Sequence, residues 1–484
     1  MHAAINEIGK DVHTVRACVF DYELLITRDI DNIKAIFNTQ SADFDIGPHR
    51  EKTFKSAFGL GVMTARGEAW QHSRRLIRPQ FTRDNTANLP MFEKHVQSLF
   101  KKLRPTQDLW TSKVDLQPLF SYCTLDISTE FLVSGQYILP GTPSDFHKYG
   151  QSVWSQDVDA RSRLPLSRDP EAPDVANFGA HLDEVKHILD RQGALAKYSW
   201  LVNSDGYSEH CKGLRSFVDY FVRKALEQTN EEKRSSDMQD KYVLLDELAK
   251  HSRNPAELRN ETLNVLHASR DTTAALMGWI VYFLARHEDV FQTLRAEILN
   301  TFTSNGTPIE ITFKGIHSMT FMPQVINETI RMVGIVPMNE RAALQDTTLP
   351  RGGGPDGLSP VFVPKGRQIL IPTYSMQHRE DIWGPDVDKF KPSRWTGRRA
   401  DWDFIPFGSG ARQCLGQQFA RTQVMYVIIR LLQTFDAIEN VEAPGPMRFH
   451  HTIENRSGSG VQVRLHAALP TTFHALRQGV SAEE

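Results

Sequence analysis

Hydrophobic residues recur at three- and four-residue spacing through most of residues 68–299, a period that predicts helices. The stretches PMFEKHVQSLFKKL, LRSFVDYFVRKALEQ and VFQTLRAEILNTF are examples. Near the N-terminus the apolar run CVFDYELLIT predicts a strand, and DIDNIKAIFNT after it predicts a short helix. The pattern therefore indicates a mainly helical protein, and we expect one large domain over residues 1–484.

The pattern changes between residues 336 and 371, where short apolar pieces alternate with Gly and Pro. This change predicts a small sheet with a glycine-rich hairpin at residues 352–357. Helical spacing returns only after Cys414, in QQFARTQVMYVIIRLLQTF. A charged, polar stretch at residues 227–240 separates two predicted helices. We interpret it as a loop within the domain, with a domain linker as the alternative.

The composition excludes several classes of protein. Lys and Arg number 56 against 58 Asp and Glu, so the charge does not favour nucleic acid as a partner. The four cysteines are far apart and lack zinc-type spacing, which favours a reducing compartment. The N-terminus lacks the apolar stretch of a signal peptide. The longest apolar run, residues 274–285, is shorter than the roughly 20 residues that span a bilayer, so we expect no membrane-spanning segment.

Cys414 lies in the glycine-rich string FGSGARQCLG, directly before an apolar helix. A phosphate-binding loop of the G-x-G-x-x-G type does not fit, because Gln413 occupies the place of the third glycine. A C-x5-R phosphatase loop does not fit either, since Ala420 stands where the arginine is needed and Arg421 follows it. A lone cysteine is most often a small buried hydrophobic residue. The whole string instead favours a thiolate metal ligand at a helix N-terminus, where a negative sulfur is stabilised.

This string resembles the haem-binding signature of the cytochrome P450 family, and the residues at the family's positions are Phe407, Gly410, Arg412, Cys414 and Gly416. The resemblance implies haem b, iron protoporphyrin IX, with the cysteine thiolate as the axial ligand of the iron. It also implies that the glycines leave space for the macrocycle and that the arginine reaches a haem propionate. The phenylalanine is expected to pack on the cysteine side of the haem.

A second motif of the family is an ExxR, formed here by Glu328 and Arg331. Three-residue spacing places the carboxylate and the guanidinium on one helix face, where they can form an ion pair. Alone, such a pair is usually on the surface. The segment FKPSRW, which contains Arg394, is similar to a segment that completes a network with the ExxR in the family. The resemblance implies that these three residues give structural support to the haem site.

A third motif lies in a long predicted helix that starts at Asn254, because Asn is a good N-cap and Pro255 suits the first turn. Within this helix the string ASRDTT, residues 268–273, resembles the family's distal motif. The resemblance implies that Asp271 and Thr272 deliver protons during oxygen activation. Ser269 departs from the pattern, since the family usually has glycine there. A bare DTT would more often have no functional role.

Two further segments supply candidate propionate partners. Trp70 and Arg74 form a WxxxR, whose four-residue spacing puts the indole N–H and the guanidinium on one helix face. By the resemblance both contact a haem propionate, and Arg341, in the extended segment after the ExxR, resembles a third partner. In isolation a WxxxR is more often core packing next to a surface charge.

The resemblance implies a mainly α cytochrome P450 fold with a small β subdomain. The stretches GEAWQHSRRLIRPQF, ASRDTTAAL and DTTLPRGGGPDGLSPVFVPKG resemble the fungal branch that contains alkane and fatty-acid terminal hydroxylases. We therefore expect a monooxygenase that uses O₂ to hydroxylate an apolar, long-chain substrate, such as a fatty acid, an alkane or a polyketide-like chain. The expected substrate contacts are residues 54–65, Leu266, Ala268, Thr272, Val336, Pro337, Met338 and Thr452.

The sequence shows no flavin or nicotinamide motif, so electrons must come from a partner, and the resemblance implies NADPH-cytochrome P450 reductase. A basic face could steer it, with the candidates Arg74, Arg75, Arg78, Lys101, Lys102, Arg398 and Arg399. We expect the cytosolic side of the endoplasmic reticulum, with peripheral membrane association. Two alternatives stay open: a haem-thiolate isomerase or dehydratase that needs no external electrons, and a catalytically impaired haem- or lipid-binding protein.

Overall fold

The structure is a computed structural model and describes residues 2–19, 21–82, 85, 88–133, 175–227, 242–304 and 307–468. Most of the predicted polar loop at residues 227–240 lies outside these ranges. The chain forms two compact units, each assembled from separate stretches. The first comprises Met1–Asp45, Thr86–Cys123 and Asp271–Glu484, and the second comprises Ile46–Asn85 and Thr124–Arg270.

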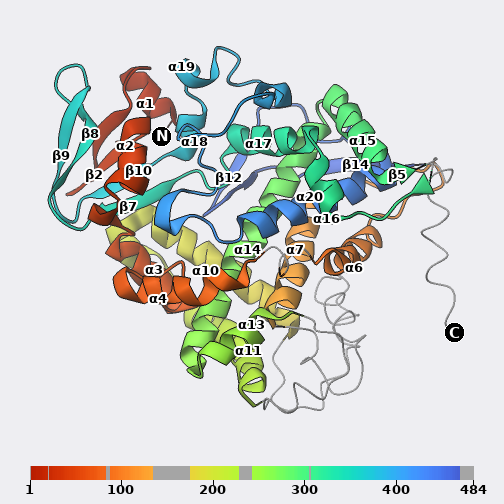
Figure 1. Cartoon of the computed structure of the whole chain (residues 1–484), viewed down its shortest axis with the longest axis horizontal. Helices are drawn as coiled ribbons and strands as arrows, with labels where there is room; N and C mark the ends of the chain where they lie inside the picture. Colours follow the sequence, from red (N-terminus) through yellow and green to blue (C-terminus); the bar gives the residue numbers. More distant parts are fainter. Residues whose placement is uncertain are drawn as a thin grey trace. The chain divides into compact units, whose positions relative to one another are not determined.

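The first unit combines helices with the β region, as the sequence predicts (Figure 1). Its helices include α1 (His2–Ile8), α2 (Ile30–Lys34), α6 (Leu89–Phe100), α15 (Glu288–Phe302), α16 (Phe313–Ser318), α17 (Phe321–Val333), α18 (Thr373–Gln377), α19 (Glu380–Trp383) and α20 (Gln417–Thr434). The predicted helix after residue 28 is α2, and it continues as a π-helical turn at Ala35–Thr39.

A five-stranded sheet in the first unit combines strands from residues 14–45 with strands from residues 339–371. The strand order is β1-β2-β10-β7-β3, with β1 (Thr14–Val19), β2 (Tyr22–Thr27), β3 (Phe44–Asp45), β7 (Asn339–Ala343) and β10 (Gln368–Ile371). β10 runs parallel to β2, with Ile369 opposite Leu25, and antiparallel to β7, with Ile369 opposite Arg341. Leu25, Ile33 and Ile369 are buried together in its core. The single N-terminal strand expected at residues 18–27 is thus part of a hairpin, β1 and β2, within a sheet completed from the C-terminal half.

The predicted glycine-rich hairpin is confirmed as β8 (Thr347–Gly353) and β9 (Ser359–Val363). The amide of Gly352 donates to the carbonyl of Gly357 at 2.8 Å, which closes the turn. The hairpin lies beside α2, where the Asn32 side chain donates to the Arg351 carbonyl at 2.9 Å (Figure 1). Smaller β elements of this unit are β4 (Val114–Asp115), β5 (Thr303–Ser304), β6 (Thr307–Pro308), β11 (Phe435–Asn440), β12 (Phe449–His451), β13 (Asn455–Ser457) and β14 (Gln462–Ala467).

The described residues of the second unit form helices and connecting loops, without a strand. Its helices include α3 (Pro48–Phe58), α4 (Gly67–Ile77), α10 (Val175–Leu195), α11 (Tyr207–Glu227), α13 (Leu244–His251) and most of α7 (Leu116–Val133). α10 and α11 pack through apolar faces, where the rings of Phe178 and Phe217 stack with centroids 3.8 Å apart. The three- and four-residue periodicity of this region is therefore a reliable indicator of its structure.

The 30-residue helix α14 (Pro255–Leu284) contributes to both units, the second up to Arg270 and the first from Asp271. It begins as predicted, because the side-chain oxygen of Asn254 accepts hydrogen bonds from the amides of Ala256 (3.0 Å) and Glu257 (3.4 Å). Its apolar end is a buried core segment, with Trp279 fully enclosed. Among the described residues, no helix has the length and apolar character needed to cross a bilayer.

Candidate active site

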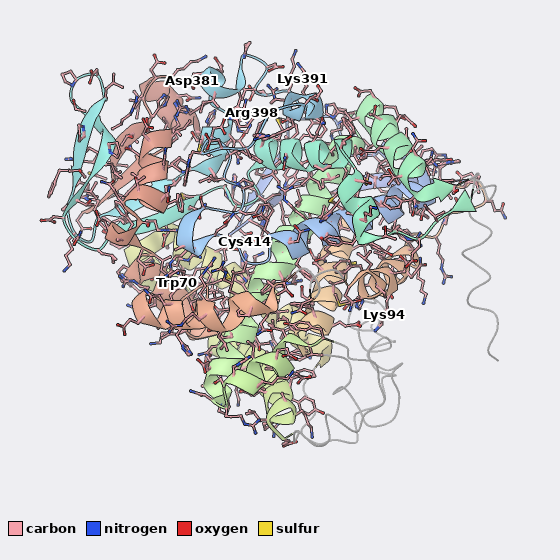
Figure 2. All side chains as sticks on the ribbon, in the orientation of Figure 1. Trp70, Lys94, Asp381, Lys391, Arg398 and Cys414 are labelled. Carbon is pink, nitrogen blue, oxygen red and sulfur yellow. The ribbon has the colours of Figure 1, made fainter. Side chains whose placement is uncertain are left out.

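Cys414 lies on the tight loop that leads into α20 (Figure 2). Its amide donates to the carbonyl of Phe407 at 3.0 Å, and the amide of Gln413 donates to the carbonyl of Gly410 at 3.1 Å. The Cys414 residue is exposed, whereas Cys123 and Cys211 are buried. Cys414 therefore lies three residues before an 18-residue helix whose N-terminus favours negative charge.

The glycines of this loop have different roles. Gly408 and Gly410 adopt left-handed backbone angles, with φ of 68° and 69°. A Cβ on Gly410 would lie 1.9 Å from the carbonyl oxygen of Phe37, so this position has no room for any side chain. Gly416 has an ordinary φ of −85° and is the N-cap of α20. Gly410 is thus required by the packing of the loop, while Gly416 marks the start of the helix.

Arg412 forms an ion pair with a residue that the sequence did not single out. Its guanidinium lies 2.7 Å from a carboxylate oxygen of Asp45, at the end of β3, and both side chains are about nine-tenths buried. A guanidinium has five N–H donors, so one arginine can donate to more than one acid group. No sequence pattern connects residues 45 and 412, because 366 residues separate them and only the fold brings them together.

Arg421, one turn into α20, packs against Phe407 of the Cys414 loop. Its guanidinium carbon is 5.1 Å from the centre of the Phe407 ring, and one nitrogen donates to the side chain of Asn327 at 3.0 Å. Burial lowers the pKa of Arg421. The residue lines a cavity of about 290 Å³ together with Trp402 and Gln413. The Phe407 side chain is therefore packed against a cation from α20, a contact that the sequence did not reveal.

The structure brings Glu328, Arg331 and Arg394 together. Arg331 donates to both carboxylate oxygens of Glu328, at 2.8 and 2.9 Å, and both side chains are fully buried. Arg394 donates to Glu328 at 3.4 Å, and the indole N–H of Trp395 donates to it at 3.0 Å. The amide of Lys391 also donates to Glu328, at 3.0 Å. One buried carboxylate thus receives donors from α17 and from the segment that precedes the Cys414 loop.

The same network reaches the surrounding backbone. Arg331 donates to the carbonyl of Gln377 at 3.1 Å. Arg394 donates to the carbonyl of Trp383 and to the side chain of Asp386, each at 2.7 Å. The hydrogen bond from Arg394 lowers the pKa of Asp386 to about 2. Because buried charges are stable only when they are paired and hydrogen-bonded, this set of contacts fixes the chain path before the loop.

Arg341 lies on β7, in the five-stranded sheet of the same unit. Its side chain is buried, with 7% of the residue exposed. The guanidinium carbon is 4.7 Å from the centre of the Phe37 ring, and one nitrogen donates to the carbonyl of Glu340 at 2.7 Å. Phe37 is also the residue whose carbonyl borders Gly410. One short helical segment, Ala35–Thr39, therefore contacts both Arg341 and the cysteine loop.

Asp271 and Thr272 lie in the middle of α14. Asp271 is 2% exposed, and Thr272 is partly buried. Ser269, three residues before Thr272, points its hydroxyl to α7, where it lies 2.9 Å from the hydroxyl of Ser128. It is also 3.2 Å from the carbonyl of Leu266. The side chain that replaces the usual glycine is thus held by contacts within the second unit.

Trp70 and Arg74 lie on α4, as the WxxxR spacing predicts (Figure 2 labels Trp70). The guanidinium carbon of Arg74 is 5.7 Å from the centre of the Trp70 ring, a cation–π distance. Both side chains are partly buried. They belong to the second unit, so their contact with haem propionates stays a prediction.

The donor set of the first unit fits a haem held by a thiolate. An exposed thiol is the soft ligand that haem iron takes from cysteine, and Gly410 allows the loop to adopt its tight path. Arg341 and Arg412 are nearly buried cations that can donate to the carboxylates of the propionates. The buried Glu328 network holds the segment that leads to the loop.

Comparisons with known proteins extend over nearly the whole chain. A sequence model of the family described as Cytochrome P450 matches residues 1–454. Cytochrome P450 monooxygenase g430 of Fusarium sp is 38% identical over 457 residues, which are 93% of this chain and 77% of that protein. Cytochrome P450 52A13 of Debaryomyces hansenii is 38% identical over 419 residues, with 86% and 76% covered. Cytochrome P450 52A5 of Candida maltosa is 36% identical over 453 residues, with 92% and 81% covered.

A solved structure has the same fold. The crystal structure of the cytochrome P450DA heme domain superposes with a TM-score of 0.74 and covers 97% of this chain and 92% of its own. The two sequences are 18% identical, so the likeness concerns the fold alone. It confirms the predicted mainly helical architecture with a small β region.

Proposed function

Because this chain belongs to the cytochrome P450 family and is a haem-thiolate monooxygenase, we propose that it hydroxylates long, apolar substrates of the fatty-acid or alkane kind. The observation that carries the proposal is the identity of 38% over 93% of the chain to a fungal cytochrome P450 monooxygenase, together with the intact cysteine loop. The substrate class is supported by the three segments that resemble the fungal alkane and fatty-acid branch, and by the mostly apolar character of the expected substrate contacts.

The haem site is proposed to use the residues of the first unit as follows. Cys414 would hold the iron through its sulfur. The packing of Arg421 on the Phe407 ring would support the loop. Arg341 and Arg412 would hold the propionates, with Trp70 and Arg74 as further partners from α4. Glu328, Arg331 and Arg394 would keep the loop in place. The haem, when bound, supplies the oxidising chemistry, and the protein supplies orientation, protons and exclusion of water.

Proton delivery is proposed for Asp271 and Thr272. The carboxyl oxygens of Asp271 can accept a proton that originates in solvent, and the hydroxyl of Thr272, one residue on, can donate one to oxygen. The position of Ser269 is compatible with this role, because its hydroxyl is engaged with Ser128 and Leu266. The side chain that departs from the family pattern therefore has its own partners on α7 and α14.

The electron donor is proposed to be NADPH-cytochrome P450 reductase, since cytochromes P450 generally take electrons from a redox partner. Lys101, Lys102 and Arg399 are exposed and available to an acidic surface. Arg398 differs, because it pairs with Asp403 and lies 4.0 Å from the Trp383 ring centre. Its charge is therefore partly neutralised within the chain. We propose the cytosolic side of the endoplasmic reticulum as the location, with peripheral membrane contact.

The proposal can be tested with the purified haem protein and a reductase. We expect saturated fatty acids from dodecanoic to octadecanoic acid to shift the spin state of the haem and to yield hydroxylated products that depend on NADPH and reductase. Turnover without NADPH would favour an isomerase or dehydratase, and binding without products would favour a binding protein. The Cys414→Ser variant should lose the absorption of the reduced carbon monoxide complex that is typical of cysteinate ligation. If no fatty acid in this series gives a shift or a product, the substrate class is wrong.

A further inference from the structure

A polar ladder runs along one side of α14 in the second unit. Its members are Asn260, Glu261, Asn264 and His267, at three- and four-residue spacing. Glu261 and Asn264 are 1% exposed, and His267 is 5% exposed. Buried polar side chains in a helix are costly unless they are hydrogen-bonded, so their partners show what the ladder is for.

Asn264 binds the segment after α3 from both ends of its amide. The nitrogen donates to the carbonyl of Phe58 at 3.0 Å, and the oxygen accepts from the amide of Met63 at 3.1 Å. The same oxygen lies 3.3 Å from the hydroxyl of Thr64. Glu261 adds a further bond, because its carboxylate accepts from the amide of Val62 at 3.0 Å. Two side chains of α14 thus satisfy backbone groups directly before and within residues 59–65, a loop without regular secondary structure.

The loop is shaped to fit these side chains. A Cβ on Gly59, whose φ is 68°, would lie 2.1 Å from the side-chain oxygen of Asn260, and a Cβ on Gly61 would lie 2.7 Å from the side-chain nitrogen of Asn264. Inside the loop, the hydroxyl of Thr64 donates to the carbonyl of Gly59 at 2.7 Å and accepts from the amide of Gly61 at 2.9 Å. The two glycines allow the backbone to lie directly on the ladder.

The aromatic residues before the loop are held by the next member of the ladder. His267 stacks on Phe58 with ring centroids 4.5 Å apart and an angle of 18° between the planes. Phe54 lies 6.0 Å from His267 and 6.3 Å from Phe58. One side of α14 therefore orients both the loop and the aromatic rings of α3.

We propose that Asn264 and Glu261 are positioning residues that fix the conformation of loop 59–65 and so set the shape of the surface offered to substrate. This inference rests on the proposed function, in which residues 54–65 contact the substrate. A loop that moved away would break the hydrogen bonds that the buried Asn264 amide and Glu261 carboxyl group make with residues 58–64, which is unfavourable. The hydrogen bonds from Asn264 and Glu261 to residues 58–64, called the clasp below, therefore hold the loop in one conformation.

The surroundings of Glu261 allow both of its protonation states near neutral pH. Burial raises its pKa to about 7, opposed by hydrogen bonds from Ser73 and from the Val62 amide. The charged groups that face it are Glu257 on α14 and His72 on α4, which pair with each other at 2.5 Å. A neutral glutamine at position 261 would still accept the Val62 amide, whereas leucine would not, and this difference isolates the hydrogen bond from the charge.

The test uses the full-length haem protein and measures the clasp directly. Asn264→Ala should raise the hydrogen exchange of the Val62 and Met63 amides by at least about tenfold, because their partners are removed or freed to move. Arg259→Ala is the control on the same helix, since the Arg259 guanidinium donates to Asp219 on α11 at 3.1 Å. Unchanged exchange in Asn264→Ala would overturn the proposal.

Substrate readouts then test the consequence. Asn264→Ala and Glu261→Leu should change the affinity for dodecanoic acid and for 4-phenylimidazole about fivefold or more, and should alter the position of hydroxylation. Glu261→Gln should keep the wild-type product pattern, which a general loss of stability would not explain. Faster exchange with unchanged affinities and products would contradict the proposal. If dodecanoic acid fails in every variant but 4-phenylimidazole affinity still changes, the substrate class is wrong and the positioning role is supported.

The two variants Glu261→Leu and Glu261→Gln keep the proposal testable if Asn264→Ala folds poorly. The carbon monoxide spectrum reports the fraction of intact haem protein, so affinities are compared per intact molecule. If Asn264→Ala yields no intact protein, Glu261→Leu against Glu261→Gln carries the same comparison. Equal product patterns in these two variants would then overturn the proposal.

Discussion

Gly408 and Gly410 have nearly the same left-handed backbone angle but different surroundings. Apart from its chain neighbours, no described residue has an atom within 4 Å of a Cβ at Gly408, whereas a Cβ on Gly410 would collide with the Phe37 carbonyl. Gly408→Ala should therefore lower the free energy of unfolding by about 1 kcal/mol, the cost of the left-handed backbone angle alone. Gly410→Ala should lose about 3 kcal/mol or more and bind less haem, because the backbone must also shift.

Haem content and unfolding midpoints of these two variants provide the comparison. Strain alone would affect both variants equally. Equal losses in the two variants would show that contact with Phe37 does not restrict the loop.

Glu261 gives a prediction for pH. Burial raises its pKa from the ordinary 4.5 to about 7, so the native state holds a proton that the unfolded chain releases. Its contribution to the free energy of unfolding is fully present below pH 4.5 and is lost as the pH rises through about 7. The change amounts to about 3 kcal/mol, and Glu261→Gln should lack it.

Chemical denaturation of wild type and Glu261→Gln across this range measures the difference. Comparing the two proteins removes the contribution of all other titrating groups. A difference that stays constant with pH would mean that the carboxyl group titrates normally.

At the scale of elements, the buried Glu328 network joins α17 to the segment before the cysteine loop. Glu328→Gln leaves the fully buried guanidinium of Arg331 without its negative partner, and breaking such a buried pair typically costs about 3–5 kcal/mol. We expect little or no haem protein from this variant. Lys391→Ala is a suitable control, because the Lys391 side chain forms only an exposed pair with Asp386, typically of about 1 kcal/mol or less (Figure 2 labels Lys391).

Carbon monoxide spectra and unfolding midpoints distinguish the two variants. The amide of Lys391, which donates to Glu328, is retained in the control. Normal haem content in Glu328→Gln would show that the network does not support the loop.

The pairing of strands shows what the local pattern could not give. The sequence predicted the C-terminal strands and the N-terminal strand separately, and both exist. Their union in one sheet, with Leu25 opposite Ile369, depends on residues 344 positions apart. The spacing of apolar residues identifies a strand, but it carries no information on a distant partner.

At the scale of the whole molecule, charge on the surface is proposed to guide the electron donor. Lys101→Glu and Lys102→Glu should lower reductase-supported turnover by about fivefold at low ionic strength, and the loss should shrink as salt screens the charges. Lys365→Glu, on the exposed turn after β9, makes the same change in net charge and should have no such effect.

Turnover at several salt concentrations, with the haem content measured in parallel, tests this surface. A loss that is the same in all three variants would point to net charge alone. Unchanged turnover in the two variants at positions 101 and 102 would remove this surface from the proposal.

The sequence by itself determined the features that depend on neighbours along the chain. The cap at Asn254, the ExxR spacing of Glu328 and Arg331, and the cysteine string follow from contacts within a few residues, and a string this specific carried the family as well. Only the tertiary structure decided that Asp45 pairs with Arg412 and that Asn264 holds loop 59–65. These contacts join residues about 200 or more positions apart, and their partners are set by the path of the folded chain, which no local period encodes.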